Sequence, residues 1–127
     1  MLSYILKKRS WWEHPVIDLW TIPHTLSGAL LAYAVIWFGI NLWLGLGIGI
    51  AIAIGWEIFE KITHISDVEH HTNGASDVIV AQIGYGAGVW LFTTYTTIGF
   101  GAGIAACLLL IFGGISLLGW LSHHWYG

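Results

Sequence analysis

Two long stretches of the chain contain no Asp, Glu, Lys or Arg, and they constrain the fold more than any other feature. The first runs from Leu19 to Trp56 and the second from Val78 to Gly127. A helix that crosses a bilayer needs about 20 residues, so each stretch has room for two crossings. Only 9% of all residues are charged, against roughly 25% in soluble domains. The sequence therefore predicts an all-α, polytopic membrane protein.

Turn-forming residues divide each stretch into two helices. The first stretch divides at Gly39-Ile40-Asn41 and the second near Thr97-Ile98-Gly99, where Gly, Asn and Thr favour a reversal of the chain. We predict a four-transmembrane-helix bundle that forms one membrane domain over residues 1–127. Its transmembrane helices are expected at about 22–39, 42–62, 77–96 and 101–122.

Residues 1–20 are predicted to form an interfacial segment that lies along the membrane, because they combine apolar residues and a basic cluster with tryptophans that suit the headgroup boundary. No cleaved signal is expected, since the positive charges follow the first apolar run. In a four-helix topology all the basic residues fall on one side of the membrane, which the positive-inside rule makes the cytosol. We therefore expect a cell-membrane protein with both termini cytosolic. The basic residues are Lys7, Lys8, Arg9 and Lys61.

Small residues recur on one face of the predicted helix 77–96. At about 100° per residue, Asp77 shares this face with Ala81, Gly84 and Gly88, a spacing that lets helices approach closely. Asp77 should therefore point into the bundle, where a carboxylate is costly and is usually retained for a partner or a function. The alternative is that the helix dipole favours Asp77 in a first turn and that Asn73 contributes to the cap. Helix 42–62 carries small residues on several faces, so we expect it to lie at the centre of the bundle.

A polar group ends the predicted helix 42–62. Glu57, Glu60 and His64 are spaced i, i+3 and i+7, which places them on one helical face. Two carboxylates and an imidazole there can bind a divalent metal or share a proton. The competing interpretation is a hydrated helix end that carries a Glu60–His64 pair.

The predicted topology brings further polar residues to the same membrane boundary. His24 lies in the first turn of helix 22–39, close to the end of helix 42–62 and the start of helix 77–96. Taken alone, a histidine at such a position is more often a hydrogen-bonded structural residue than a functional one. We predict catalytic roles for His24, Glu57 and Asp77, a ligand-binding role for Asn73, and a divalent metal held by Glu57, Glu60, His64 and Asp77. No other cofactor is predicted.

The region from His24 to Gly88 resembles the VanZ-like membrane proteins and the related YjdF-type small membrane proteins. The resemblance consists of a histidine that begins one helix, the run Trp56-Glu57-Ile58-Phe59-Glu60 that ends the next, and a polar loop that leads to Asn73, Asp77, Gly84 and Gly88. It covers about half of the chain, and the polar loop differs in lacking an arginine. The resemblance implies an envelope-associated membrane protein, and site roles for His24, Glu57, Asn73 and Asp77.

Three functions are compatible with these features. The first is a VanZ-like protein that binds or processes a lipid or a lipid-linked envelope component at the inner membrane face. The second is a non-catalytic accessory subunit of a larger membrane complex. Cation transport ranks last, because only Gln82 and Tyr85 of helix 77–96 offer polar groups near the midplane. The expected partners are the lipid bilayer, other membrane subunits or further copies of the chain. A formal net charge of −3 argues against nucleic acid.

Overall fold

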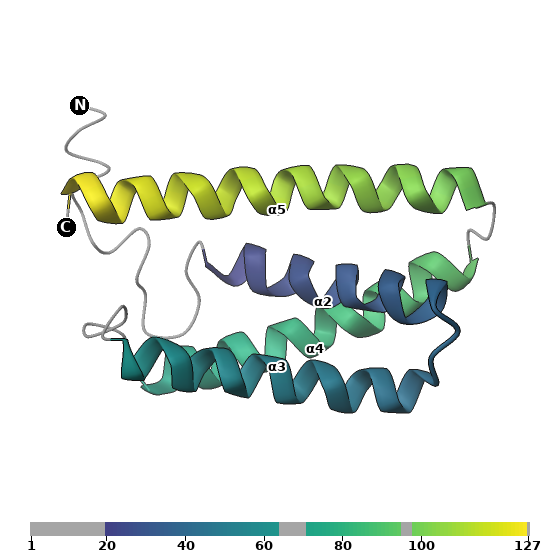
Figure 1. Ribbon diagram of the computed structural model, residues 1–127, viewed down its shortest axis with the longest axis horizontal. Coiled ribbons are helices and arrows are strands. Elements are labelled where there is room, and N and C mark those ends of the chain that lie inside the picture. The colour runs from purple at the N-terminus through teal and green to yellow at the C-terminus, as the bar shows by residue number, and fades with distance from the viewer. Residues whose placement is uncertain (1–19, 64–70, 95–97, 127) are drawn as a thin grey trace.

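The computed structural model describes residues 20–63, 71–94 and 98–126, with side chains at 20–63, 74–94 and 101–121. Within these ranges the chain is all-helical, and Figure 1 shows the helices arranged as one bundle. The predicted all-α bundle is therefore confirmed. The interfacial segment predicted for residues 1–20 lies outside the described ranges, apart from Trp20. The helices are α2 (Thr21–Trp37), α3 (Leu42–Ile62), α4 (His71–Thr94) and α5 (Ile98–Tyr126).

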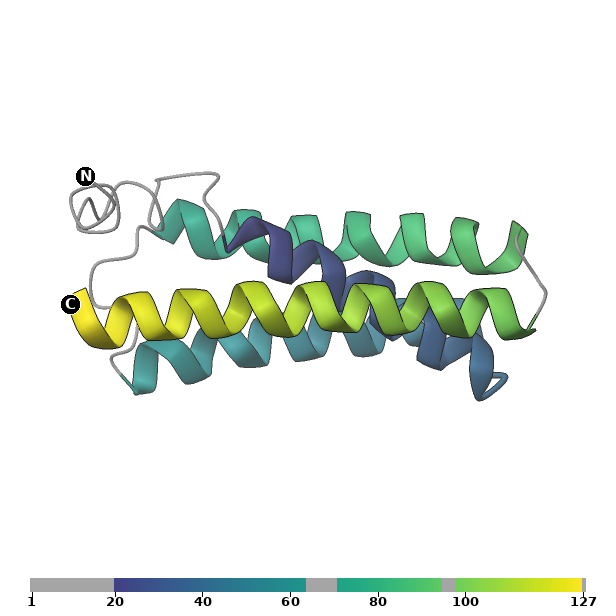
Figure 2. The same cartoon turned by 90° about the horizontal axis from the view of Figure 1, so that it is seen from above.

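Successive helices run in opposite directions along the bundle. The start of α2, the end of α3, the start of α4 and the end of α5 lie at the same end of the molecule in both ribbon views (Figures 1 and 2). We refer to this end as the polar end, because Glu57 and Asp77 lie there. The arrangement is the up-and-down order that was predicted from the two divided stretches.

Two helices are longer than predicted. Helix α4 begins at His71 instead of Asp77, so residues 71–76, which were expected to belong to a loop, already form helical turns before Asp77. The polar residues at 71–76 do not end the helix, because this segment contains no proline and Gly74 is tolerated within a helical turn. Helix α5 spans 29 residues, Ile98–Tyr126, and extends beyond the predicted range 101–122. Helix α3 has the predicted bounds.

Three of the four helices are long and apolar enough to cross a membrane: Leu42–Ile62 of α3, Gly74–Thr94 of α4 and Gly101–Leu121 of α5. Helix α2 is apolar but has 17 residues, which corresponds to about 26 Å at 1.5 Å per residue. A crossing by α2 stays a prediction.

The turn between α2 and α3 is built by the two residues that the sequence analysis identified there. Gly39 has a φ of 65°, and the amides of Gly39 and Ile40 donate to the carbonyls of Ile36 and Val35, as in a Schellman motif. The Asn41 side chain then accepts hydrogen bonds from the amides of Trp43 (2.9 Å) and Leu44 (3.2 Å). It therefore caps α3, and the predicted chain reversal is confirmed.

The closest helix pair is α2 with α4, and glycines permit its short separation. A Cβ at Gly28 would overlap the Ala81 carbonyl, and a Cβ at Gly84 would overlap the Thr25 carbonyl. A Cβ at Gly88 would approach Ala29 to 2.8 Å. The α4 face predicted to pack is thus confirmed as a packing face. The expectation that helix 42–62 is central is wrong, because α2 is enclosed by α4 and α5, whereas most side chains of α3 are exposed. Small residues on several faces of α3 therefore do not indicate that it is surrounded.

Tyr85 connects α4 with the start of α3. Its hydroxyl donates to the Leu42 carbonyl (2.8 Å) and lies against Gly45, while its ring packs with Ala32 and Val35 in the buried core. Helix α5 is placed against α2 on the other side (Figure 1). Helices α2, α3 and α4 therefore meet at the polar end, and α4 contacts both of the others.

Candidate polar site

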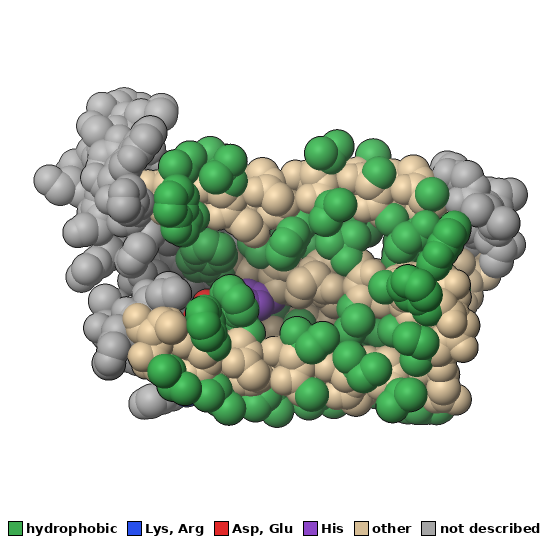
Figure 3. Space-filling model, in the orientation of Figure 1, with side chains coloured by type: hydrophobic (Ala, Val, Ile, Leu, Met, Phe, Trp, Pro, Cys, Tyr) green, Lys and Arg blue, Asp and Glu red, His purple; other side chains and the backbone are tan. Residues whose placement is uncertain are grey.

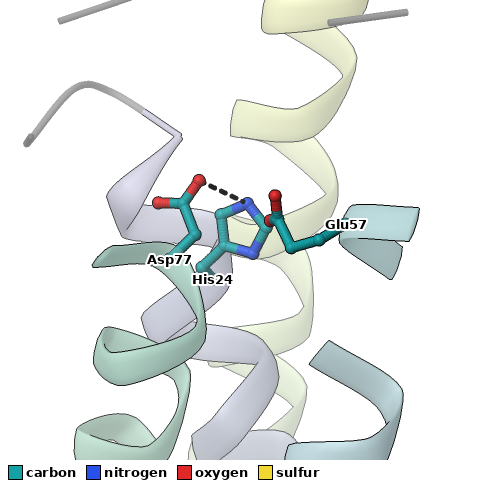
Figure 4. A group of neighbouring side chains, drawn as sticks. All are labelled: His24, Glu57 and Asp77. Carbon is teal, nitrogen blue, oxygen red and sulfur yellow. Dashed lines mark ion pairs between the residues drawn. The ribbon is translucent and has the colours of Figure 1, made fainter. Parts of the chain in front are cut away.

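His24, Glu57 and Asp77 come together at the polar end of the bundle. His24 belongs to the first turns of α2, Glu57 to the last turns of α3, and Asp77 to α4. One ligand atom from each lies within 4.8 Å of the other two, and Figure 4 shows the imidazole between the two carboxyl groups. Side chains that are far apart in the sequence thus form one polar cluster, which we name the His24–Glu57–Asp77 site.

His24 and Asp77 are the most closely spaced pair in the site. The Nε2 atom of His24 lies 3.4 Å from Oδ2 of Asp77, slightly beyond the 2.7–3.2 Å range typical of an N–H···O hydrogen bond. The Asp77 residue is only 1% exposed, whereas 19% of the His24 side chain is exposed. Asp77 is thus the buried side of the pair, and the imidazole forms its accessible side.

Glu57 enters the site through a gap left by a glycine. Its carboxyl group lies directly over Gly74 in the first turns of α4, where a Cβ would overlap Oε2. The residue is 9% exposed, although neighbouring positions of α3 such as Trp56 and Ile58 are about half exposed. Carboxylates are favoured near a helix N-terminus. The first turns of α4 therefore form the surface on which the Glu57 carboxyl group packs, and we name the contact with Gly74 the seat of Glu57.

The α2–α4 contact holds His24 and Asp77 opposite each other. Thr25 and Gly28 pack against Gly84 and Ala81 of α4, and these four residues follow His24 and Asp77 along the same helices. The Ser27 hydroxyl donates to the His24 carbonyl (2.7 Å) and ties down the turn that carries the histidine. Because the backbones are in direct contact, a shift of one helix along the other would separate the pair.

The other predicted site residues have different positions. Glu60 accepts a hydrogen bond from the indole of Trp56 (2.6 Å) and does not belong to the cluster of possible metal ligands found among the described residues. Asn73 lies in the first turn of α4, but its side chain is outside the described part of the chain, as is all of His64. Of the predicted Glu57–Glu60–His64 face, Glu57 thus belongs to the site and Glu60 does not, while the prediction for His64 lies outside the described residues.

Sequence reasoning missed the contribution of Gly74, and it considered Gln82 only as a polar group near the midplane. A glycine one turn before a buried Asp was the available signal for the seat of Glu57. The Gln82 amide lies against Gly49 of α3, and its Oε1 atom is buried without a hydrogen-bond partner among the described residues. Gln82 therefore places a polar group in the α3–α4 contact, and it lies farther along α4 from the polar end than Asp77 does.

The site is partly open on one face of the molecule. In the space-filling view of Figure 3 a histidine and an acidic side chain are visible in a hollow surrounded mainly by apolar side chains. Of the His24 side chain, 19% is exposed. A molecule with both polar and apolar parts would meet both kinds of surface here.

The arrangement has two chemical capacities. An imidazole between two carboxyl groups can accept and return a proton. The same three groups can also provide nitrogen and oxygen ligands to one divalent cation. Among the described residues both capacities arise where α2, α3 and α4 converge.

Comparisons of the chain with protein-family models, with curated proteins and with solved structures found no significant match.

Proposed function

We propose that the protein is a multi-pass protein of the cell membrane that binds an amphiphile, such as a lipid or a lipid-linked envelope component, and acts on its polar head at the His24–Glu57–Asp77 site. The observation that carries this proposal is the convergence of the three side chains within 4.8 Å. Purely structural helix ends do not require titratable groups from three helices to meet. Proton transfer by His24 and the binding of one divalent cation by the three groups are the two ways in which this site can act on the head.

The location of the site supports an amphiphilic ligand. It lies at one end of helices that are long enough to cross a membrane, beside exposed apolar residues of α3 such as Trp56, Ile58 and Phe59. A lipid would place its polar head at the membrane boundary and its chains along such a surface. The VanZ-like interpretation belongs to this proposal, and it is supported by the meeting of three of its four predicted site residues.

The proposal can be tested by the lipids that accompany the purified protein. We expect wild-type protein, extracted in mild detergent, to retain one lipid class above its proportion in the host membrane, as measured by liquid chromatography and mass spectrometry. His24→Gln and Asp77→Asn should lose this enrichment, whereas Glu60→Gln should keep it. Identical lipid profiles in all four proteins would contradict the proposal.

We further propose that the polar end faces the cytosol. The four basic residues of the chain are at the N-terminus and at Lys61, and the end of α3 that carries Lys61 lies at the polar end. The positive-inside rule then places both termini in the cytosol. Reporter fusions to either terminus that are active only in the cytosol should be active, and an active periplasmic or extracellular reporter would contradict this orientation.

A second candidate function is that of an accessory subunit in a larger membrane complex. It is favoured by outward-facing glycines, since a Cβ at Gly47 or Gly55 of α3, or at Gly103 of α5, would meet no atom within 4 Å. Small residues on exposed membrane helices allow close contact with another helix. Cross-linking in native membranes should then give a defined partner band that Gly47→Leu and Gly55→Leu abolish, while the lipid profile is unchanged by His24→Gln.

A further inference from the structure

We infer that His24, Glu57 and Asp77 bind one divalent transition-metal ion. This inference builds on the proposed function, because it assigns a cofactor to the same site. It replaces the ligand set predicted from the sequence, in which Glu60 and His64 accompanied Glu57 and Asp77. The structure adds His24, to which the sequence analysis assigned a catalytic role and not that of a metal ligand.

The His24–Asp77 distance fits two ligands of one ion better than it fits a hydrogen bond. Zinc binds imidazole nitrogen and carboxylate oxygen at about 2.0–2.2 Å, so two ligands of a tetrahedral ion lie about 3.4 Å apart. The observed separation between Nε2 and Oδ2 is 3.4 Å. These two atoms thus already have the spacing of two ligands on one ion. The α2–α4 contact holds the buried Asp77 in this position.

Glu57 is positioned to complete the set with a small adjustment. The three ligand atoms lie within 4.8 Å of one another, and two atoms bound to the same ion at about 2.2 Å are at most about 4.4 Å apart. A rotation about the side-chain bonds of Glu57 is enough to close the difference. The Glu57 carboxyl group fills the place that a Cβ at Gly74 would take, and as the flexible end of a long side chain it can move without displacing a helix.

The donor types restrict the metal. One imidazole and two carboxyl oxygens suit zinc, iron(II) or manganese(II), and the site lacks the sulfur ligands that select copper(I). Three protein ligands also leave a coordination position open, as in catalytic rather than structural zinc sites. A phosphate or carboxylate oxygen of the amphiphile can occupy this position, which compensates for the absence of arginine from the predicted polar loop. The ion thereby gives the acidic site an affinity for an anionic head group.

A measurement of zinc affinity tests the inference directly. Protein stripped with a chelator and reconstituted in phosphatidylcholine nanodiscs should bind one equivalent of ZnCl2 with high affinity in a calorimetric titration. We expect His24→Gln, Glu57→Gln and Asp77→Asn each to weaken this binding at least about tenfold, and Glu60→Gln to leave it unchanged. Cobalt(II) provides a second measurement, because its visible absorption should change in His24→Gln through the loss of a nitrogen ligand.

The result that would overturn the inference is zinc binding that none of the three site substitutions weakens, or the absence of high-affinity binding in wild-type protein. Loss of binding in Glu60→Gln would equally overturn it, in favour of the ligand set predicted from the sequence. Circular dichroism and gel filtration of each variant identify a protein that has not folded. If Asp77→Asn fails this check, His24→Gln and Glu57→Gln decide the outcome.

The two proposals fail in different ways. Lipid enrichment that persists in the chelator-treated protein, combined with no zinc binding, would refute the metal and leave the amphiphile-binding function in place. Zinc binding without any lipid enrichment would establish the metal and refute the proposed ligand.

Discussion

Helix α4 has two glycines, Gly84 and Gly86, that are almost adjacent in the sequence and opposite in their surroundings. A Cβ at Gly84 would overlap the backbone of α2, whereas a Cβ at Gly86 would meet no atom within 4 Å. Helix α3 repeats the contrast, since Gly45 and Gly49 face Tyr85 and Gln82 but Gly47 faces open space. The inward glycines set the helix separations that bring the polar site together. The outward ones are free for contacts with lipid or another protein.

The largest expected effect comes from filling the α2–α4 contact. Gly84→Ala should reduce the free energy of unfolding by about 3 kcal/mol, the upper part of the usual range for overpacking, because the added carbon meets backbone that cannot rotate away. Gly86→Ala is the matched control and should be neutral or slightly stabilising, since alanine is the better helix former. Reversible unfolding in mixed detergent measures both. Equal effects of the two substitutions would remove the distinction between the two faces.

The next largest effect is expected from a substitution at Gly74, beneath Glu57. It should change the affinity for zinc and not the free energy of unfolding. In Gly74→Ala the added carbon displaces the flexible end of Glu57, so we expect about a tenfold loss of zinc affinity, equivalent to about 1.4 kcal/mol, with little change in unfolding. Gly55→Ala, close to Glu57 but facing open space, is the control. Unchanged zinc affinity in Gly74→Ala would show that the carboxyl group does not need this position.

Tyr85 tests how firmly α4 holds the start of α3. Tyr85→Phe removes the hydrogen bond to the Leu42 carbonyl and should cost about 1 kcal/mol of unfolding free energy. The control is Tyr33→Phe, because the Tyr33 ring packs against Trp37 and Phe92 and its hydroxyl has no hydrogen bond within the described ranges. Chemical unfolding of the two variants should rank them in this order, and the reverse order would contradict the contact.

The smallest effect is expected at the exposed turn between α2 and α3. Asn41→Ala removes the cap that accepts from Trp43 and Leu44 and should cost about 0.5–1 kcal/mol, while Asn41→Asp should largely restore stability. Thermal unfolding of the three proteins measures this difference. A cost as large as that of Gly84→Ala would mean that the outer turn, rather than the inward glycines, determines the fold.

Much of this fold could be predicted because charge and turn residues act locally. The charge-free stretches fixed where membrane helices could lie, and Gly39 and Asn41 marked the reversal before α3. The start of α4 could not be found in this way, because a polar segment beside a membrane is compatible with either a loop or a helix. The packing of Glu57 on Gly74 is a tertiary contact that favours the helix over the loop, and the local sequence does not reveal it.

The site was predictable in its location but not in its full membership. The face shared by Asp77 and Gly84 correctly indicated that Asp77 points into the bundle, and the topology indicated that His24 and Glu57 would be near it. Glu60 was included because helical spacing alone places it near Glu57. Its hydrogen bond with Trp56 depends on side-chain geometry that spacing does not contain.

The most direct test of the site is anomalous diffraction from crystals of the zinc-loaded protein, collected at the zinc absorption edge. Our account predicts a peak at the polar end about 2.0–2.2 Å from an imidazole nitrogen of His24 and from one carboxyl oxygen each of Glu57 and Asp77. A peak coordinated by Glu60 instead, or zinc bound only at other histidines, would contradict the claim that three helices converge to form this site.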